Sequence, residues 1–179
     1  MKKFQHILWL GAVALSTAAC AVKHPVAAQT PAVPATEKML LGTQTKAAFT
    51  KAPYSEWYNP QHDSYQMDMA AIQQLKNNNL GSYDMVVTLG SWCEDSHREF
   101  PRMMKILEEL NFPEKNLKII AVNRQKVSPS KDEELYDIHR VPTFILKKGE
   151  KEIGRIVEFP QSGYLERDLL QILKKSNKN

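Results

Sequence analysis

The chain has 179 residues and a formal net charge of +4, with 42% apolar and 25% charged residues. These values are close to globular averages, so they exclude wholesale disorder and a polytopic membrane protein, and the length suits one compact domain. A nucleic-acid partner would need a clustered basic face, and the longest basic cluster, Lys147, Lys148 and Lys151, is interpreted as a solvated hairpin turn, so we expect no such partner.

The first twenty residues carry an export pattern. Lys2 and Lys3 supply positive charge, residues 7–15 form an apolar run, and small residues fill positions 16–19 before Cys20. The apolar run is too short for a transmembrane helix and is typical of a secretory signal. We therefore expect residues 1–20 to be a signal peptide.

Cys20 follows Ala18 and Ala19, an arrangement that resembles a bacterial lipoprotein signal, in which the cysteine is lipidated and becomes the mature N-terminus. Ordinary cleavage after Ala21 or Ala28 is the alternative. In both cases the protein is exported to a compartment where disulfide chemistry is active. Lipidation at Cys20 would anchor it on the periplasmic side of a bacterial membrane.

Residues 21–38 combine Pro25, Pro31 and Pro34 with Ala, Val and Thr. Proline removes amide donors and favours extended polyproline II conformations, so this segment is predicted to be a tether between membrane and domain.

Residues 39–80 are predicted to form an N-terminal helical and aromatic extension. A short helix is expected over 46–51, and helical apolar spacing over 67–80 ends in an asparagine-rich C-cap. We expect its aromatic side chains to pack on the core: Tyr54, Trp57, Tyr58 and Tyr65.

Residues 81–176 are predicted to be the main α/β domain. Apolar runs indicate strands at 85–89, 117–122, 143–146 and 153–157, with a hairpin turn at 147–150, and helical periodicity indicates helices at 94–110, 131–138 and 164–173. Short crossovers imply that the first two strands are parallel, and the hairpin adds an antiparallel edge, giving a mixed central sheet with helices on both faces. Arg98, Glu99 and Arg102 are interpreted as a solvated helix face.

Cys93 is the one thiol expected in the mature fold, if Cys20 belongs to the export signal. It lies where a strand gives way to a helix, and a helix N-terminus favours the thiolate, the nucleophile of disulfide exchange. Glu94 and Asp95 oppose the thiolate by like charge. The alternative is a buried structural cysteine, although the polar flanks argue against it.

His97 follows Cys93 by one helical turn, so the pair could activate the thiol, and the alternative is a solvated histidine. His139 lies shortly before Pro142 and could also approach the site. Cys93, His97 and His139 would then make a soft-metal site, a hypothesis that rests on spacing alone. Our preferred prediction contains no metal and no cofactor.

The motifs together resemble the thioredoxin superfamily. Trp92-Cys93-Glu94-Asp95-Ser96 stands where thioredoxins have W-C-x-x-C, followed by a helix proline, Pro101. Val141-Pro142-Thr143-Phe144 resembles the cis-proline motif, and Lys148-Gly149-Glu150 the hairpin after it. The likeness spans about residues 82–175 and is closest to exported bacterial proteins with a single-cysteine W-C-x-D-[ST] motif. It implies a thioredoxin-like three-layer α/β/α fold with an N-terminal extension.

The resemblance also implies roles. Cys93 would be the attacking thiol, and Pro142, after a cis bond, would lie against it. Trp92, Val141 and Thr143 would bind substrate, the backbone of Val141 pairing with an extended segment. Ser96 replaces the resolving cysteine and cannot attack a mixed disulfide.

These features predict an exported thiol–disulfide oxidoreductase that reduces or isomerises disulfides through Cys93, with an external thiol as the resolving group. Its partners would be exported proteins with disulfides or thiols, or a small-molecule thiol. Two alternatives stay open: a non-catalytic module that binds peptides or thiols, and a copper-delivery protein.

Overall fold

The structure is a computed structural model that describes residues 38–177. The chain divides into two units, Met1–Val33 and Pro34–Asn179, and all described residues belong to the second. The predicted signal peptide, the lipidation at Cys20 and the tether up to residue 37 lie outside the described residues.

The elements follow the chain in this order: β1 (Gly42–Gln44), α1 (Lys46–Phe49), α2 (Ser55–Ser64), α3 (Met69–Lys76), η1 (Leu80–Ser82), β2 (Asp84–Leu89), α4 (Glu94–Glu109), η2 (Glu114–Asn116), β3 (Leu117–Ala121), α5 (Asp132–Leu135), β4 (Thr143–Lys148), β5 (Lys151–Val157) and α6 (Leu165–Ser176). None of the helices in the described part of the chain has the length and apolar content needed to cross a membrane.

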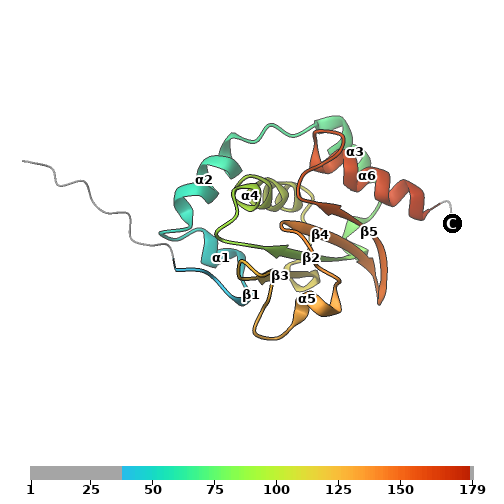
Figure 1. Ribbon diagram of the computed structural model, residues 1–179. Helices are drawn as coiled ribbons and strands as arrows, with labels where there is room; N and C mark the ends of the chain where they lie inside the picture. The colour runs from blue at the N-terminus through green and yellow to red at the C-terminus, as the bar shows by residue number, and fades with distance from the viewer. Residues whose placement is uncertain (1–37, 178–179) are drawn as a thin grey trace, which may run out of the picture. The chain divides into compact units, whose positions relative to one another are not determined.

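A five-stranded mixed sheet forms the middle layer, in the order β1-β3-β2-β4-β5. β2 and β3 run parallel, as predicted, and β4 pairs antiparallel with both β2 and β5, so the hairpin supplies the edge strand β5. Figure 1 shows the sheet nearly edge-on, with α2, α3, α4 and α6 on one side and α5 on the other. This arrangement confirms the predicted three-layer α/β/α fold.

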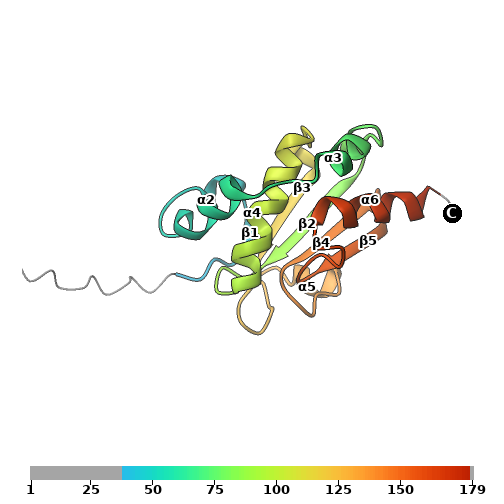
Figure 2. The same ribbon diagram turned by 90° about the horizontal axis from the view of Figure 1, so that it is seen from above.

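The larger core lies between the sheet and the helices α3, α4 and α6, which Figure 2 shows from above. α4 is amphipathic, and its apolar side, including Phe100 and Met103, is fully buried. Phe100 packs on Phe49 of α1 with ring centroids 4.6 Å apart. The N-terminal extension therefore shares the core of the main domain.

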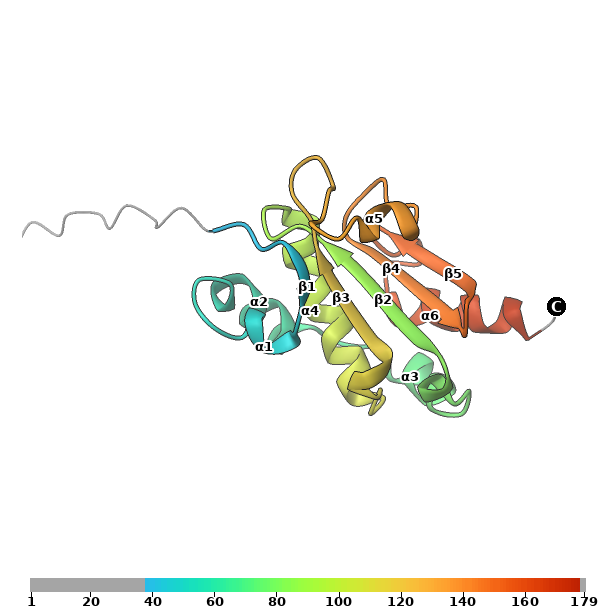
Figure 3. The ribbon, with the colours of Figure 1, turned by 90° about the horizontal axis from the view of Figure 1, so that it is seen from below.

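The opposite face of the sheet carries a smaller cluster. It contains Val86, Ile120, Val122, Ile138, Val141 and Ile145, and Trp92, Cys93 and Tyr136 pack against it. The short helix α5 lies over only part of this face (Figure 3). Farther along the strands, Lys118 and Lys147 both lie over the Tyr136 ring, at 5.3 and 5.6 Å from its centroid.

The extension contains two elements that the sequence did not predict, β1 and α2. β1 pairs antiparallel with β3, placing Gly42 opposite Ala121. A strand of only three residues, Gly-Thr-Gln, gives too little alternation for recognition. The prediction for the aromatic residues is confirmed: Tyr54 and Tyr58 are buried in the larger core, and Trp57 and Tyr65 pack against it.

Two helical predictions need correction. The helix expected at 131–138 covers only Asp132–Leu135, because the backbone at Asp137 is left-handed (φ 52°). Glu99 is not solvated. It is 3% exposed, and its carboxylate forms ion pairs with Arg98 at 2.6 Å and Arg102 at 3.4 Å. Arg102 in turn donates to the Gln61 side chain of α2 at 3.1 Å, so the arginine beside Glu99 is held by the extension.

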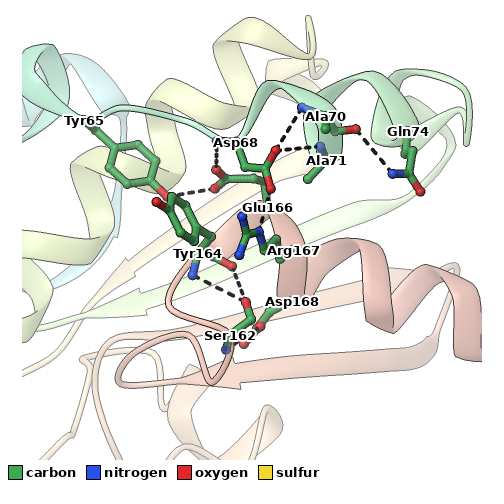
Figure 4. A network of polar contacts seen from close by, with 10 residues as sticks. All are labelled: Tyr65, Asp68, Ala70, Ala71, Gln74, Ser162, Tyr164, Glu166, Arg167 and Asp168. Atoms are coloured by element: carbon green, nitrogen blue, oxygen red, sulfur yellow. Dashed lines mark hydrogen bonds and ion pairs between the residues drawn. The ribbon is translucent and has the colours of Figure 1, made fainter.

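A polar network ties the segment before α3 to α6 (Figure 4). The fully buried carboxylate of Glu166 accepts hydrogen bonds from the Tyr65 hydroxyl at 2.8 Å and from the Asp68 amide at 2.5 Å. Burial, followed by the contact with Glu166, raises the pKa of Tyr65 far above its usual range. Asp68 caps α3 and pairs with Arg167 at 2.6 Å. The network therefore fixes the N-terminal extension to α6.

Candidate functional site

Cys93 is the N-cap residue of α4 and is half-buried. Its amide donates to the Gly90 carbonyl at 3.0 Å, and its carbonyl accepts the first helical hydrogen bond, from the His97 amide, at 2.9 Å. Its thiol donates to the Val141 carbonyl, with Sγ and O 3.4 Å apart. The turn from Gly90 and the start of the helix thus present the sulfur to the loop before β4.

That loop contains the predicted proline motif. The Val141–Pro142 peptide bond is cis, and the Pro142 carbonyl accepts the Glu158 amide at 2.7 Å. The hydroxyl of Thr143 donates to the Arg140 carbonyl at 2.7 Å, so this side chain is engaged inside the loop. Of the two residues predicted to bind substrate in this loop, Val141 contacts the thiol, through its carbonyl.

Trp92 lies on the smaller cluster. Its indole Nε1 donates to the Val122 carbonyl at 2.9 Å, and the Arg124 guanidinium stacks over the ring, 5.2 Å from its centroid. A Cβ atom at Gly90 would lie only 2.6 Å from the indole, closer than real Cβ contacts. Gly90 is therefore required by the close approach of the Trp92 ring.

The structure places Ser96 beneath the turn that precedes Cys93. It is fully buried, and its Oγ accepts the Gly90 amide hydrogen bond at 3.2 Å. The residue at the position of a resolving cysteine thus supports the turn that carries Cys93.

The two acidic residues after Cys93 have different surroundings. Glu94 is exposed, whereas Asp95 pairs with Arg98 at 2.6 Å. Arg98 also contacts Glu99, and these carboxylates, Glu99 first, raise the pKa of the Arg98 guanidinium. The negative charge of Asp95 is therefore partly compensated by Arg98.

The histidines do not assemble a metal site with Cys93. His97 Nε2 lies 2.6 Å from the Ser91 carbonyl, and its ring stacks on Trp57, 4.3 Å away at 10°. His139 is exposed and pairs with Asp137 at 2.9 Å. Within residues 38–177 no group of three His, Cys, Asp or Glu side chains is placed to hold a metal ion. His97 is also not a solvated histidine, because its ring packs on the extension.

Sequence reasoning did not place three further residues at the turn that carries Cys93: Leu40, Trp57 and Ser91. Ser91 is 1% exposed, and its hydroxyl accepts the Leu40 amide at 3.0 Å. Leu40 and Ser91 are 51 positions apart, a separation at which local spacing carries no information.

Exposed apolar side chains lie at the same end of the sheet as Cys93. Strand register places the end of β2, the start of β1, the end of β3 and the end of β5 at this end of the sheet. Its exposed large apolar residues are Leu41, Val127, Val157 and Phe159. A separate cavity of about 550 Å³ lies near the other end of α4, beside Leu107 and Phe112, and none of its lining residues is a predicted site residue.

Comparisons with known proteins extend only to the fold. No protein-family model matches the sequence, and no curated protein matches it. A protein of unknown function from Pseudomonas aeruginosa superimposes with a TM-score of 0.53 at 16% identity, covering 76% of this chain and 93% of its own. An HIV epitope scaffold gives 0.54 at 15% identity, with 76% and 94% covered.

The germline-specific thioredoxin Deadhead from Drosophila melanogaster gives a TM-score of 0.37 at 12% identity, covering 63% of this chain and 96% of its own. Scores and identities this low do not transfer a function. The strand order, the helix layers and the position of Cys93 before α4 describe a thioredoxin-like α/β fold.

Proposed function

We propose that this chain is an exported thiol–disulfide oxidoreductase that acts through Cys93 alone, with an external thiol as the resolving group. The observation that carries the proposal is the placement of Cys93: half-buried, at the N-terminus of a long helix, with Sγ 3.4 Å from the carbonyl before Pro142. A helix N-terminus offers amide donors and a positive dipole to a thiolate.

The chemistry proceeds by exchange. The Cys93 thiolate attacks one sulfur of a substrate disulfide, forming a mixed disulfide and releasing the other sulfur as a thiolate. An external small-molecule thiol then displaces the substrate, and a second one frees Cys93. Two external thiols are thus oxidised to their disulfide for each substrate disulfide that is reduced. Attack by a second substrate thiol instead gives isomerisation.

Ser96 supports the single-cysteine mechanism. Its oxygen is committed to the Gly90 amide, and a hydroxyl cannot displace a sulfur from a mixed disulfide. Cys93 is the free cysteine among the described residues, so release depends on a thiol from outside this part of the chain.

We expect wild-type protein to accumulate mixed disulfides with a model peptide disulfide, measured by intact mass. Ser96→Cys should shorten their lifetime and raise turnover in an insulin reduction assay, because a second sulfur lies on the same helix turn. Ser96→Ala, which also fills the buried position, serves as control and should still accumulate the mixed disulfide. Catalytic reduction by wild type without added thiol would contradict the mechanism.

The exposed apolar side chains at the same end of the sheet as Cys93 favour a second candidate, a peptide-binding module without turnover. Leu41, Val127 and Phe159 would then contact an extended apolar peptide. Exchange by the wild type distinguishes the two: the module binds a peptide disulfide without exchanging with it, whereas the oxidoreductase exchanges and loses all exchange in Cys93→Ser.

Export and anchoring through Cys20 are part of the proposal and rest on the N-terminal pattern. Mass spectrometry of the mature protein should find a lipid on Cys20 as the first residue. An unlipidated protein that begins beyond Cys20 would remove the anchor and leave export in place.

A further inference from the structure

We propose that His97 is a positioning residue for Cys93 and that the N-terminal extension, through Trp57, belongs to the thiol site. This inference rests on the proposed disulfide exchange for its meaning, but its geometry is independent of it. Neither residue touches a reacting sulfur in the proposed steps. Both act through the turn that carries Cys93.

The turn between Gly90 and Cys93 is closed by the amide of Cys93, which donates to the Gly90 carbonyl at 3.0 Å. Ser91 lies inside this turn and is held at two of its groups. Its carbonyl lies 2.6 Å from His97 Nε2, and its hydroxyl accepts the Leu40 amide at 3.0 Å. Movement of the turn would break both contacts.

His97 contacts the turn twice. Its backbone amide donates to the Cys93 carbonyl at 2.9 Å, and its ring reaches the carbonyl of Ser91. A carbonyl oxygen can only accept, so the hydrogen in this contact belongs to Nε2. The imidazole ring therefore acts as a donor that joins the first turn of α4 to the segment before Cys93.

Trp57 fixes the orientation of that ring. The two rings are nearly parallel, 10° apart with centroids at 4.3 Å. Trp57 itself packs edge-on against Phe49, with centroids 5.9 Å apart, in the larger core. The orientation of the donor is thus set by α2, an element outside the part of the chain that resembles thioredoxins.

A test needs a readout that general loss of stability would not move. We choose the ratio of two rate constants of Cys93: exchange with a peptide disulfide, which needs the sulfur aligned beside Val141, and alkylation by iodoacetamide, which needs only access. A positioning role predicts that this ratio falls about tenfold in His97→Leu, which keeps bulk but has no donor. Trp57→Leu should lower it in the same direction.

Two variants serve as controls. His97→Gln retains an N–H group at about the place of Nε2 and should keep the ratio within about twofold of wild type. His62 is a matched histidine, because it stacks on Tyr58 at 5.6 Å and pairs with Glu108 at 3.0 Å, also between α2 and α4. His62→Leu should lower the thermal unfolding midpoint and leave the ratio unchanged.

Hydrogen exchange supplies a second measurement that needs no disulfide chemistry. His97→Leu should speed exchange of the Leu40 and Cys93 amides selectively, whereas His62→Leu should not. If exchange and the rate ratio respond equally to both substitutions, or to neither, the positioning role is refuted. If wild type exchanges no peptide disulfide while its Leu40 and Cys93 amides respond as expected, the oxidoreductase proposal fails and the positioning of the turn stands.

Discussion

The two faces of the sheet are built differently. One face is covered by α3, α4 and α6 and holds a large core with fully buried aromatic rings such as Phe100 and Phe144. The other carries a few aliphatic side chains and the short helix α5, and farther along the strands Lys118 and Lys147 lie over the Tyr136 ring. Cys93 packs on this second cluster although α4 belongs to the first face. Most of the buried core therefore lies on one face, whereas Cys93 rests on the smaller cluster of the other, and the turn that carries it is held from the larger core through Trp57 and His97.

The largest expected effect separates the faces directly. Phe100→Ala empties a fully buried ring site between Phe49 and Tyr58, and should lower the free energy of unfolding by about 3–5 kcal/mol. Ile138→Ala, in the smaller cluster, should cost about 2 kcal/mol. Urea denaturation measures both.

Alkylation of Cys93 in the folded protein should respond in the opposite order. Ile138→Ala loosens the cluster on which Cys93 rests and should change its rate, whereas Phe100→Ala should not. Equal responses would break the division between the two faces.

A smaller effect tests the Glu166 network on the face with the larger core. Glu166→Ala leaves the Tyr65 hydroxyl and the Asp68 amide without their buried acceptor, and should cost about 2–3 kcal/mol. Tyr65→Phe removes one donor, leaves the carboxylate its backbone partner, and should cost about 1 kcal/mol. Denaturation of both variants and of the double variant gives their coupling, and strict additivity would show that the network does not act as a unit.

The smallest expected effect is a loss of stability in acid, and it involves one carboxylate on each face of the sheet, Asp68 and Asp132. Arg167 and the amides of Ala71 and Ala70 hold the pKa of Asp68 below its usual 3.8, and Lys118, then Ser130, do the same for Asp132. A lowered folded-state pKa contributes stability that is present above the unfolded value and lost as pH falls through the folded one.

The free energy of unfolding should therefore decline below about pH 4. Asp68→Asn and Asp132→Asn should each cost less at pH 3 than at pH 7, as measured by urea denaturation. A cost independent of pH would show that the charge of that carboxylate does not contribute.

Local patterns predicted β2 to β5, the long helix and the place of Cys93, but not β1, because alternation, helical spacing and turn residues act over a few positions. They did not predict contacts formed by the extension. The Arg102–Gln61 and Leu40–Ser91 hydrogen bonds both join segments far apart in the sequence. His97 is the clearest case. Its position one helical turn after Cys93 was predicted, but the contacts of its ring with Trp57 and with the Ser91 carbonyl were not.

The close approach of Trp92 to Gly90 constrains how this site can diverge. Any side chain at position 90 would displace the indole, whose Nε1–H is bound to the Val122 carbonyl, so position 90 cannot change while Trp92 keeps its place. Among homologous chains, a residue larger than glycine at position 90 should occur only together with the loss of tryptophan at position 92. An alignment in which both large residues coexist would show that the turn can adopt a second conformation.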